Sequence, residues 1–246
     1  GASGFFGVDN PVKVIGSQRS VIGKSILLFA LCVFTREAVA DPPLEEVEVR
    51  EREDARAEQA VEARAGDRYC YVIDERHRVP DPASRFQPDG VNGPGEIVDP
   101  STFTSAFTGR ESTWRGREWH EAVLYELHVG TFTREGTYAA AISRLDELAD
   151  TGVTAIELLP LNTFPGRRGW GYDGVLLYAP HVAYGGPEGL KRLVDEAHEA
   201  GLMVFLDVVY NHFGPDGNYT GLYSSRYVTE KHHTPWGAAL NYDDTG

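Results

Sequence analysis

The sequence predicts an α/β fold built on parallel strands, and three observations lead to this prediction. Three segments are almost continuously apolar, as is typical of strands buried on both faces of a sheet: 123–129, 153–159 and 202–209. Segments whose apolar residues recur at helical spacing lie between them. The resulting order is strand, helix, strand, loop, helix, strand. Parallel strands joined by right-handed crossovers have this order.

The first predicted strand, 123–129, leads into a helix that we expect to begin after Thr137 and to end near Asp150. Threonine is a common N-terminal cap, and the apolar residues that follow it fall on one face of a helix. Gly152 stands where a residue in the left-handed conformation often ends a helix. The second strand, 153–159, therefore follows directly.

A long loop, 161–174, separates the second strand from the second helix. Gly186, Pro187 and Glu188 open this helix, because proline is tolerated in the first turn and a carboxylate there interacts favourably with the helix dipole. Gly201 ends the helix, and the third strand begins at the next residue.

The sequence before residue 117 has a different character. Val47 and Val49 alternate with charged residues, which is an edge-strand pattern, and residues 66–73 alternate apolar or aromatic residues with polar ones. These two short strands look like part of a β-sandwich. Residues 80–100 are dense in Pro, Gly, Asp and Asn, so we expect a long loop or linker with little helix or strand.

Residues 1–40 fit poorly with the rest of the sequence. The apolar run 26–34 is too short to span a bilayer as a helix. The triplet 38–40 resembles a signal-peptide cleavage site, but Arg36 and Glu37 lie between it and the apolar run. We therefore favour a buried strand or a segment foreign to the protein over a signal peptide. The expected regions are an atypical segment (1–40), a partial β-sandwich with its linker (41–116) and part of the parallel α/β domain (117–246).

The charge of the chain limits its partners. The formal net charge is −14 and the pI is about 5.0, so nucleic acid and anionic membrane surfaces would repel the protein. A neutral, polyhydroxylated ligand such as a sugar is compatible with this charge, although the composition does not single it out. Cys32 and Cys70 are the only cysteines, so the chain has neither a disulfide framework nor a zinc site of the usual spacing. A single disulfide between these two cysteines stays an alternative.

Aromatic and polar residues gather where the predicted strands end, and a parallel α/β barrel carries its functional residues at this edge. Aromatic rings cover the apolar C–H faces of a sugar, while carboxylate, amide and imidazole groups bind its hydroxyls. The alternatives are packed loop aromatics, a turn-capping aspartate and a loop histidine with ordinary partners. His128 follows the first strand. The candidates for sugar binding after the second and third strands are Trp170, Tyr172, Asp173, Asp207, Asn211 and His212.

Several runs of the sequence carry a family resemblance: DVVYNH at 207–212, ELHVGTFT, GVTAIELLP and WGYDGV. Over residues 121–246 they resemble the α-amylase family of glycoside hydrolases, and DVVYNH is similar to its first conserved motif. Within the family, FPGRRGWGYDGV, PDPASRFQPDGVNGP and TPWGAALNYD are most similar to the malto-oligosyltrehalose trehalohydrolases, and glycogen branching enzymes are the alternative. Gly169 departs from the pattern, because a larger polar residue is expected before WGYDG.

The resemblance implies a TIM-type (β/α)8 barrel, of which this chain holds the first three strands, preceded by a partial carbohydrate-binding-like β-sandwich. It implies an α-glucan or maltooligosyl trehalose as the substrate. The α-1,4-glucosidic bond would be cleaved with retention, by an Asp after the fourth strand and a Glu after the fifth. These strands would come after Gly246, so we assign no catalytic residue and expect the chain alone to be inactive. Some α-amylases use the asparagine at the position of Asn211 to bind calcium, but the rest of such a site is not evident in this sequence, so we expect no cofactor and no metal.

The resemblance also implies roles for four of the candidates. Tyr172 would stack on the sugar at the cleavage subsite, and His212 would bind the hydroxyls of that sugar. Asp207 would organise the floor of the pocket, and Asn211 would hold the loop that leaves the third strand. A cytoplasmic location is implied as well. A stand-alone carbohydrate-binding protein without catalysis is the alternative from another functional class, and the oligomeric state is not predicted.

Overall fold

The computed structural model describes residues 12–16, 63–74, 76–103 and 114–243. The expectations for a signal peptide, for Cys32 and for an edge strand at Val47 and Val49 concern residues outside these ranges. Every helix within the described ranges is too short or too polar to cross a lipid bilayer.

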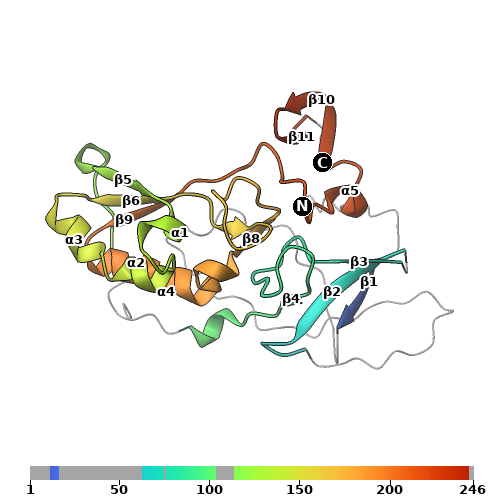
Figure 1. Ribbon diagram of the computed structural model, residues 1–246, viewed down its shortest axis with the longest axis horizontal. Helices are drawn as coiled ribbons and strands as arrows, with labels where there is room; N and C mark the ends of the chain where they lie inside the picture. Colours follow the sequence, from blue (N-terminus) through green and yellow to red (C-terminus); the bar gives the residue numbers. More distant parts are fainter. Residues whose placement is uncertain (1–11, 17–62, 75, 104–113, 244–246) are drawn as a thin grey trace, which may run out of the picture.

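Three parallel strands form the central sheet of the α/β region: β5 (Leu124–Leu127), β6 (Ala155–Leu158) and β9 (Met203–Leu206). They pair in the order β5–β6–β9, and Figure 1 shows the three arrows next to one another. Leu127, Leu158 and Leu206 are therefore neighbours at the C-terminal ends. The three predicted strands and their parallel direction are confirmed, although each strand is shorter than its apolar run.

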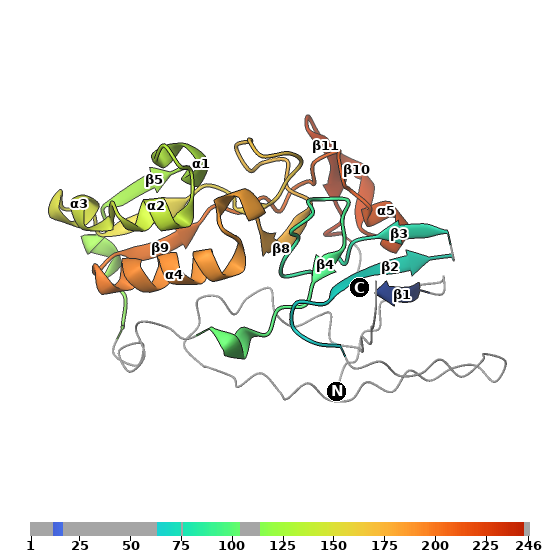
Figure 2. The ribbon, with the colours of Figure 1, turned by 60° about the horizontal axis from the view of Figure 1, so that its bottom comes forward.

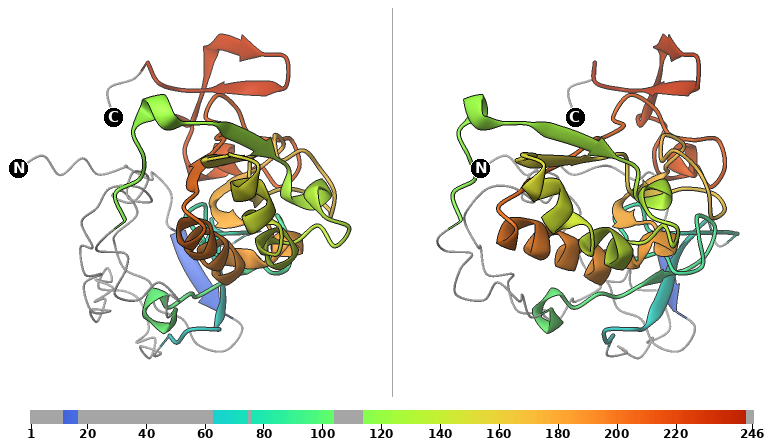
Figure 3. Two further views of the ribbon diagram at one scale, coloured as in Figure 1. Left: turned by 90° about the vertical axis from the view of Figure 1, so that its left-hand side faces the viewer. Right: turned by 60° about the vertical axis from the view of Figure 1, so that its left-hand side comes forward.

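Helices cover one face of this sheet. They are α2 (Tyr138–Ile142), α3 (Leu145–Asp150) and α4 (Gly186–Glu199). Figures 2 and 3 show them on one side of the three strands. Their buried side chains, among them Tyr138, Leu145 and Leu193, form one core with Ile156 and Leu202. Removing this apolar surface from water is the main favourable contribution to the stability of the region.

The helix predicted from Thr137 to Asp150 is in fact two helices, α2 and α3. Thr137 caps the first as expected, since its Oγ1 accepts a hydrogen bond from the Ala140 N–H at 3.3 Å. The hydroxyl of Ser143 then donates to the Ala140 carbonyl at 2.7 Å. A hydrogen bond from a serine side chain to a carbonyl of the preceding turn competes with the backbone hydrogen bonds of the helix. The next helix, α3, begins only at Leu145.

The predicted ends of the helical segments are confirmed. Gly152 after α3 and Gly201 after α4 have φ angles of 92° and 75°, in the left-handed region that favours glycine. The second helix begins at Gly186, with Pro187 and Glu188 in its first turn. Local sequence therefore determines where these segments begin and end.

Only the middle strand of the sheet, β6, is buried on both faces. Leu124 is 42% exposed, and Leu206 and Val208 at the end of β9 are 37% and 44% exposed. The prediction of burial on both faces is confirmed for β6, where the consecutive residues Ala155 and Ile156 are both 0% exposed, and is wrong for β5 and β9. The physical reason is that the described helices cover one face of the sheet and leave the C-terminal end of β9 uncovered.

Two antiparallel pairs of strands lie outside this sheet. The first is β7 (Asn162–Thr163) with β8 (Leu176–Pro180), and the second is the hairpin β10 (Val228–Thr234) with β11 (Gly237–Leu240). The first pair begins inside the segment predicted as a long loop, so part of that segment has regular structure. The other short helical turns are α1 (Val129–Phe132), α5 (Thr220–Tyr223), η1 (Pro100–Thr102), η2 (Trp119–Glu121) and η3 (Val182–Tyr184).

An antiparallel sheet precedes the α/β region. Its strands are β1 (Val12–Gly16), β2 (Arg68–Ile73), β3 (His77–Val79) and β4 (Gly95–Glu96), and β2 pairs with the other three. β2 confirms the strand predicted at 66–73, whereas the sequence pattern does not indicate β1 or β4. The described residues include one sheet here and no second sheet packed on it, so the sandwich stays a prediction.

The linker is an ordered loop, as predicted, and it joins the antiparallel sheet to the segment around α5. The hydroxyl of Tyr223 donates to the Pro80 carbonyl at 2.7 Å, and the hydroxyl of Tyr219 donates to Asn92 Oδ1 at 2.8 Å. Both tyrosine rings also pack against the apolar cluster that contains Val79. Hydrogen bonds and apolar contacts therefore hold the two regions together.

We expect Leu193→Ala to lower the free energy of unfolding by about 2–5 kcal/mol, because it opens a cavity between α4 and the sheet. Leu193 is fully buried. Leu222→Ala is the matched control, since Leu222 is 39% exposed and its truncation should cost less than about 1 kcal/mol. Denaturant melts of the purified protein measure both. Equal destabilisation by the two variants would contradict the burial described above.

Candidate functional site

The loop 161–174 packs directly against the end of β6. Gly171 has a φ of 94°, and a Cβ at this position would overlap the Pro160 carbonyl. A Cβ at Gly174 would overlap the side-chain amide of Asn162. Any side chain at these two glycines would push the loop away from the strand. The residues between and beside them are therefore held close to the C-terminal edge of the sheet.

Tyr172 connects this loop to the end of β9. Its Oη donates a hydrogen bond to Asp207 Oδ2 at 2.6 Å. This bond, with smaller contributions from burial and from the charge of Asp207, raises the pKa of Tyr172 to about 12. The nearby charges of Glu126 and Glu157, which pair across β5 and β6, act in the same direction. The hydroxyl is therefore a hydrogen-bond donor at neutral pH, while the side chain stays 41% exposed.

The segment that follows β9 packs on the same loop. A Cβ at Gly214 would overlap the Asp173 carbonyl, and the Gly214 N–H donates to the Gly174 carbonyl at 3.3 Å. The side chain of Asp173 itself is exposed. The structure therefore brings together the segments that follow the second and third strands, as their parallel arrangement predicts.

Asn211 and His212 lie under the β10–β11 hairpin. Asn211 Oδ1 is 3.2 Å from His212 Nδ1, and the Asn211 carbonyl accepts from the Leu240 N–H at 3.2 Å. The ring of His212 is 5% exposed and stacks on Trp236, with 5.6 Å between the ring centroids. His212 is thus covered in this structure. Its contact with sugar hydroxyls stays a prediction, as does the loop-holding role of Asn211.

Two residues that are not among the predicted sugar-binding candidates also lie at the C-terminal edge of the parallel sheet. Trp236 is 64% exposed and covers His212. His128, which directly follows β5, has its Nε2 2.8 Å from the Gly169 carbonyl. A histidine directly after a strand and a tryptophan in an aromatic, polar stretch are signals that the sequence contains. Neither signal reveals the partner of the side chain.

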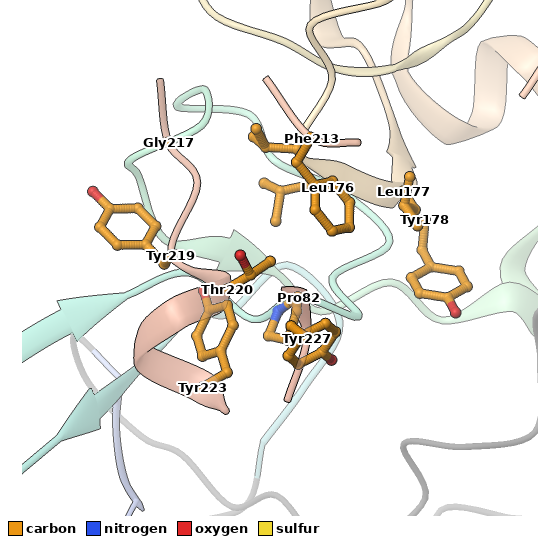
Figure 4. A pocket seen from close by; sticks show the side chains of 11 residues that line it. Pro82, Leu176, Leu177, Tyr178, Phe213, Gly217, Tyr219, Thr220, Tyr223 and Tyr227 are labelled. Atoms are coloured by element: carbon orange, nitrogen blue, oxygen red, sulfur yellow. The ribbon is translucent and has the colours of Figure 1, made fainter. Parts of the chain in front are cut away.

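A small crevice lies between the linker, β8 and residues 213–227. Its walls are mainly aromatic and apolar, as Figure 4 shows, and include Pro82, Leu176, Tyr178, Phe213, Tyr223 and Tyr227. Its volume is about 100 Å³, whereas ligand pockets usually measure about 300–1,000 Å³. The crevice is therefore too small for a sugar site. Within the described ranges, no three His, Cys, Asp or Glu side chains are grouped so as to hold a metal ion.

Residues 87–235 match the family model of the alpha amylase catalytic domain. The chain belongs to the α-amylase family. The catalytic domain of this family is a (β/α)8 barrel, so the parallel sheet of β5, β6 and β9 is part of a barrel-type fold. The family resemblance carried by DVVYNH and the neighbouring runs is confirmed.

Curated α-amylase family relatives include malto-oligosyltrehalose trehalohydrolases. The one from Saccharolobus solfataricus is 52% identical over 183 residues, which are 74% of this chain and 32% of the relative. The one from Deinococcus radiodurans is 52% identical over 177 residues, 72% of this chain and 29% of the relative. A 1,4-alpha-glucan branching enzyme from Pseudoalteromonas atlantica is 31% identical over 205 residues, 73% of this chain and 27% of the relative. The chain thus spans about a third of the length of these relatives.

Solved structures of the family have the same fold. A Salmonella typhimurium protein assigned as an alpha amylase is 50% identical, with a TM-score of 0.71 over 75% of this chain and 31% of that protein. The GBS pullulanase SAP, solved in complex with maltotetraose, is 25% identical, with a TM-score of 0.55 over 71% of this chain and 29% of that protein. The fold therefore agrees with the family membership.

His181 lies at the base of the loop 161–174 and is 1% exposed. Its ring stacks on Phe164 with 3.8 Å between the ring centroids. Burial disfavours the charged form of the imidazole and lowers the pKa of His181 to about 4. The ring is therefore neutral at neutral pH, and protonation would oppose the packing of the loop.

We expect acid to destabilise this packing. The pKa of His181 in the folded state lies below the ordinary value of 6.5, so the unfolded state binds the proton first. Stability is then lost as the pH falls from 6.5 towards 4. At pH 5 the loss from this residue is about 2 kcal/mol relative to pH 7.5.

Thermal and denaturant melts of the wild type and His181→Phe at pH 7.5 and pH 5 measure this loss. Phenylalanine keeps a ring on Phe164 and cannot be protonated, so the variant should lose less stability on acidification by about this amount. Equal losses in the two proteins would show that His181 does not contribute.

Proposed function

We propose that the complete gene product is a retaining glycoside hydrolase that releases trehalose from maltooligosyl trehalose by cleaving an α-1,4-glucosidic bond. The observation that carries the proposal is the difference in identity. The trehalohydrolases are 52% identical to this chain, whereas the branching enzyme is 31% identical. An acidic chain and a neutral α-glucan are compatible in charge.

In this proposal the chain supplies one side of the sugar site. β5, β6 and β9 are the first three strands of the barrel, and the antiparallel sheet is part of a carbohydrate-binding-like sandwich. Retaining cleavage needs two carboxyl groups about 5 Å apart on either side of the bond, and later strands of the complete protein would supply them. The role of this chain is to bind and orient the sugar. We place the enzyme in the cytoplasm.

The exposed ring of Tyr172 is the proposed stacking surface. Its hydroxyl is held by Asp207 at 2.6 Å, so the orientation of the ring is fixed before a ligand arrives. Pre-organisation of this kind lowers the entropy lost on binding. Trp170, which is 72% exposed, offers a second ring on the same loop. His212 would bind sugar hydroxyls after Trp236 moves away from it.

The proposal is tested by incubating the complete gene product with maltooligosyl trehalose and, separately, with a maltooligosaccharide of equal length. We expect free trehalose from the first substrate, detected by chromatography, and much slower hydrolysis of the second. An iodine-stain assay on amylose tests for branching activity in parallel. New α-1,6 branches without trehalose release would favour the branching enzyme instead. Glucan binding without any turnover would favour a non-catalytic binding protein.

We expect Tyr172→Ala in the complete gene product to lower kcat/KM by about 100-fold, or roughly 2.7 kcal/mol. The substitution removes both the ring and the hydrogen bond to Asp207. Tyr172→Phe keeps the ring and loses only that bond, so a reduction of about tenfold is expected. Steady-state kinetics measure both variants, and circular dichroism checks that they remain folded. Wild-type kinetics for Tyr172→Ala would show that the sugar does not bind here.

A further inference from the structure

His128 has polar contacts on both ring nitrogens, and one of them reaches the site loop. Its Nε2 lies 2.8 Å from the Gly169 carbonyl oxygen, and its Nδ1 lies 3.1 Å from Thr131 Oγ1. The hydroxyl of Tyr184 is 3.2 Å from the same Nε2. His128 follows β5, whereas Gly169 lies 41 residues further along the chain. The ring therefore ties the end of the first parallel strand to the loop after the second.

The chemistry of these partners defines the hydrogen bond. A backbone carbonyl only accepts, so Nε2 of His128 must carry a hydrogen and donate to Gly169. In the neutral ring, Nδ1 is then an acceptor, and the hydroxyl of Thr131 can donate to it. The contacts to Gly169 and Thr131 are satisfied by one tautomer of His128, and the Tyr184 hydroxyl faces the same Nε2–H with its oxygen as an acceptor.

The surroundings also fix the orientation of the ring. The rings of His128 and Tyr184 meet edge to face, with 6.0 Å between centroids and an interplanar angle of 89°. A Cβ at Gly130 would lie 2.9 Å from Cε1 of His128 and 3.0 Å from Cε1 of Tyr184. Glycine at this position therefore leaves the space that the two rings occupy. A side chain whose rotamer is fixed by packing can hold its hydrogen-bond partner in one position, and a binding site needs this precision.

Trp170 depends on such an anchor. Its side chain is 72% exposed, so packing contributes little to its position and the backbone on either side must define it. On one side the Gly169 carbonyl is held by His128, and on the other Gly171 is pressed against the Pro160 carbonyl. The imidazole also lies beside the indole, with 5.8 Å between the ring centroids.

We propose that His128 is a positioning residue, which acts through the Gly169 carbonyl to hold Trp170 where its ring can stack on an α-glucan. The substrate class in this inference rests on the proposed function. His128 does not touch the sugar. Its contribution is to hold the backbone that carries an exposed aromatic ring, with the imidazole beside that ring, so that less entropy is lost when the ligand binds.

The test compares five variants of the complete gene product, one of which is a control. His128→Leu removes the donor, while His128→Gln restores an N–H at a similar reach. Trp170→Ala removes the positioned ring, and it is also combined with His128→Leu. His198→Leu is the control for removing a histidine outside the site loop, because His198 stacks on Trp114, with 4.5 Å between the ring centroids.

For His128→Leu we expect KM to rise about tenfold while kcat changes by less than about twofold, which is the signature of lost uniform binding. His128→Gln should recover most of the loss, and His198→Leu should leave KM near the wild-type value. Because His128 acts through Trp170, the double variant should be no worse than Trp170→Ala. Full additivity of the two substitutions would overturn the proposal.

A second measurement does not depend on activity. In protein labelled with 5-fluorotryptophan, the ¹⁹F resonance of Trp170 is the one that disappears in Trp170→Phe. We expect this resonance to shift or broaden in His128→Leu and to return in His128→Gln. An unchanged resonance would overturn the positioning role even if the enzyme hydrolyses glucans. A shifted resonance in a protein without glucan hydrolysis would support the positioning role and overturn the proposed function alone.

Discussion

Parallel pairing of β5, β6 and β9 is the constraint on which the candidate site depends. Parallel strands end at the same edge of a sheet, so segments that are distant in sequence become neighbours there. Tyr172 and Asp207 are 35 residues apart and share a 2.6 Å hydrogen bond. His128 and Gly169 are 41 residues apart and share one of 2.8 Å. Each bond joins segments that follow different strands, so a change in pairing register would break both.

Glycine sets how closely these segments approach one another. Gly171, Gly174 and Gly214 all occupy positions where a Cβ would overlap a neighbouring backbone or side-chain group. The side chains of Trp170 and Tyr172, on either side of Gly171, are 72% and 41% exposed, yet the backbone that carries them is tightly packed. This combination of an exposed ring and an immobile backbone suits a ligand that binds by stacking, because the protein loses little freedom on binding.

Much of this arrangement could be predicted from the sequence, because its causes are local. The apolar runs indicate the strands, Thr137 indicates a helix start, and Gly152 and Gly201 indicate helix ends. The break at Ser143 could not be predicted, since serine occurs within helices as well as at their ends. The covering of His212 depends on a hairpin whose first strand, VTEKHHT, has no apolar alternation. The glycine at position 169 could not be predicted either, because the close approach of the Phe164 ring, 3.0 Å from where a Cβ would lie, depends on how the loop folds on itself.

The bond from Tyr223 to Pro80 spans 143 residues of the chain, which affects the order of events during synthesis. Ribosomes add roughly 5–20 residues per second, so the partner of Pro80 emerges roughly 7–30 s after Pro80 itself. During this interval the apolar face that includes Val79 lacks the tyrosine rings that later pack on it. A nascent chain that exposes such an apolar face can bind chaperones, and it can also associate with other nascent chains before it has folded. The antiparallel sheet thus begins folding early but acquires its final contacts only after the third parallel strand has been made.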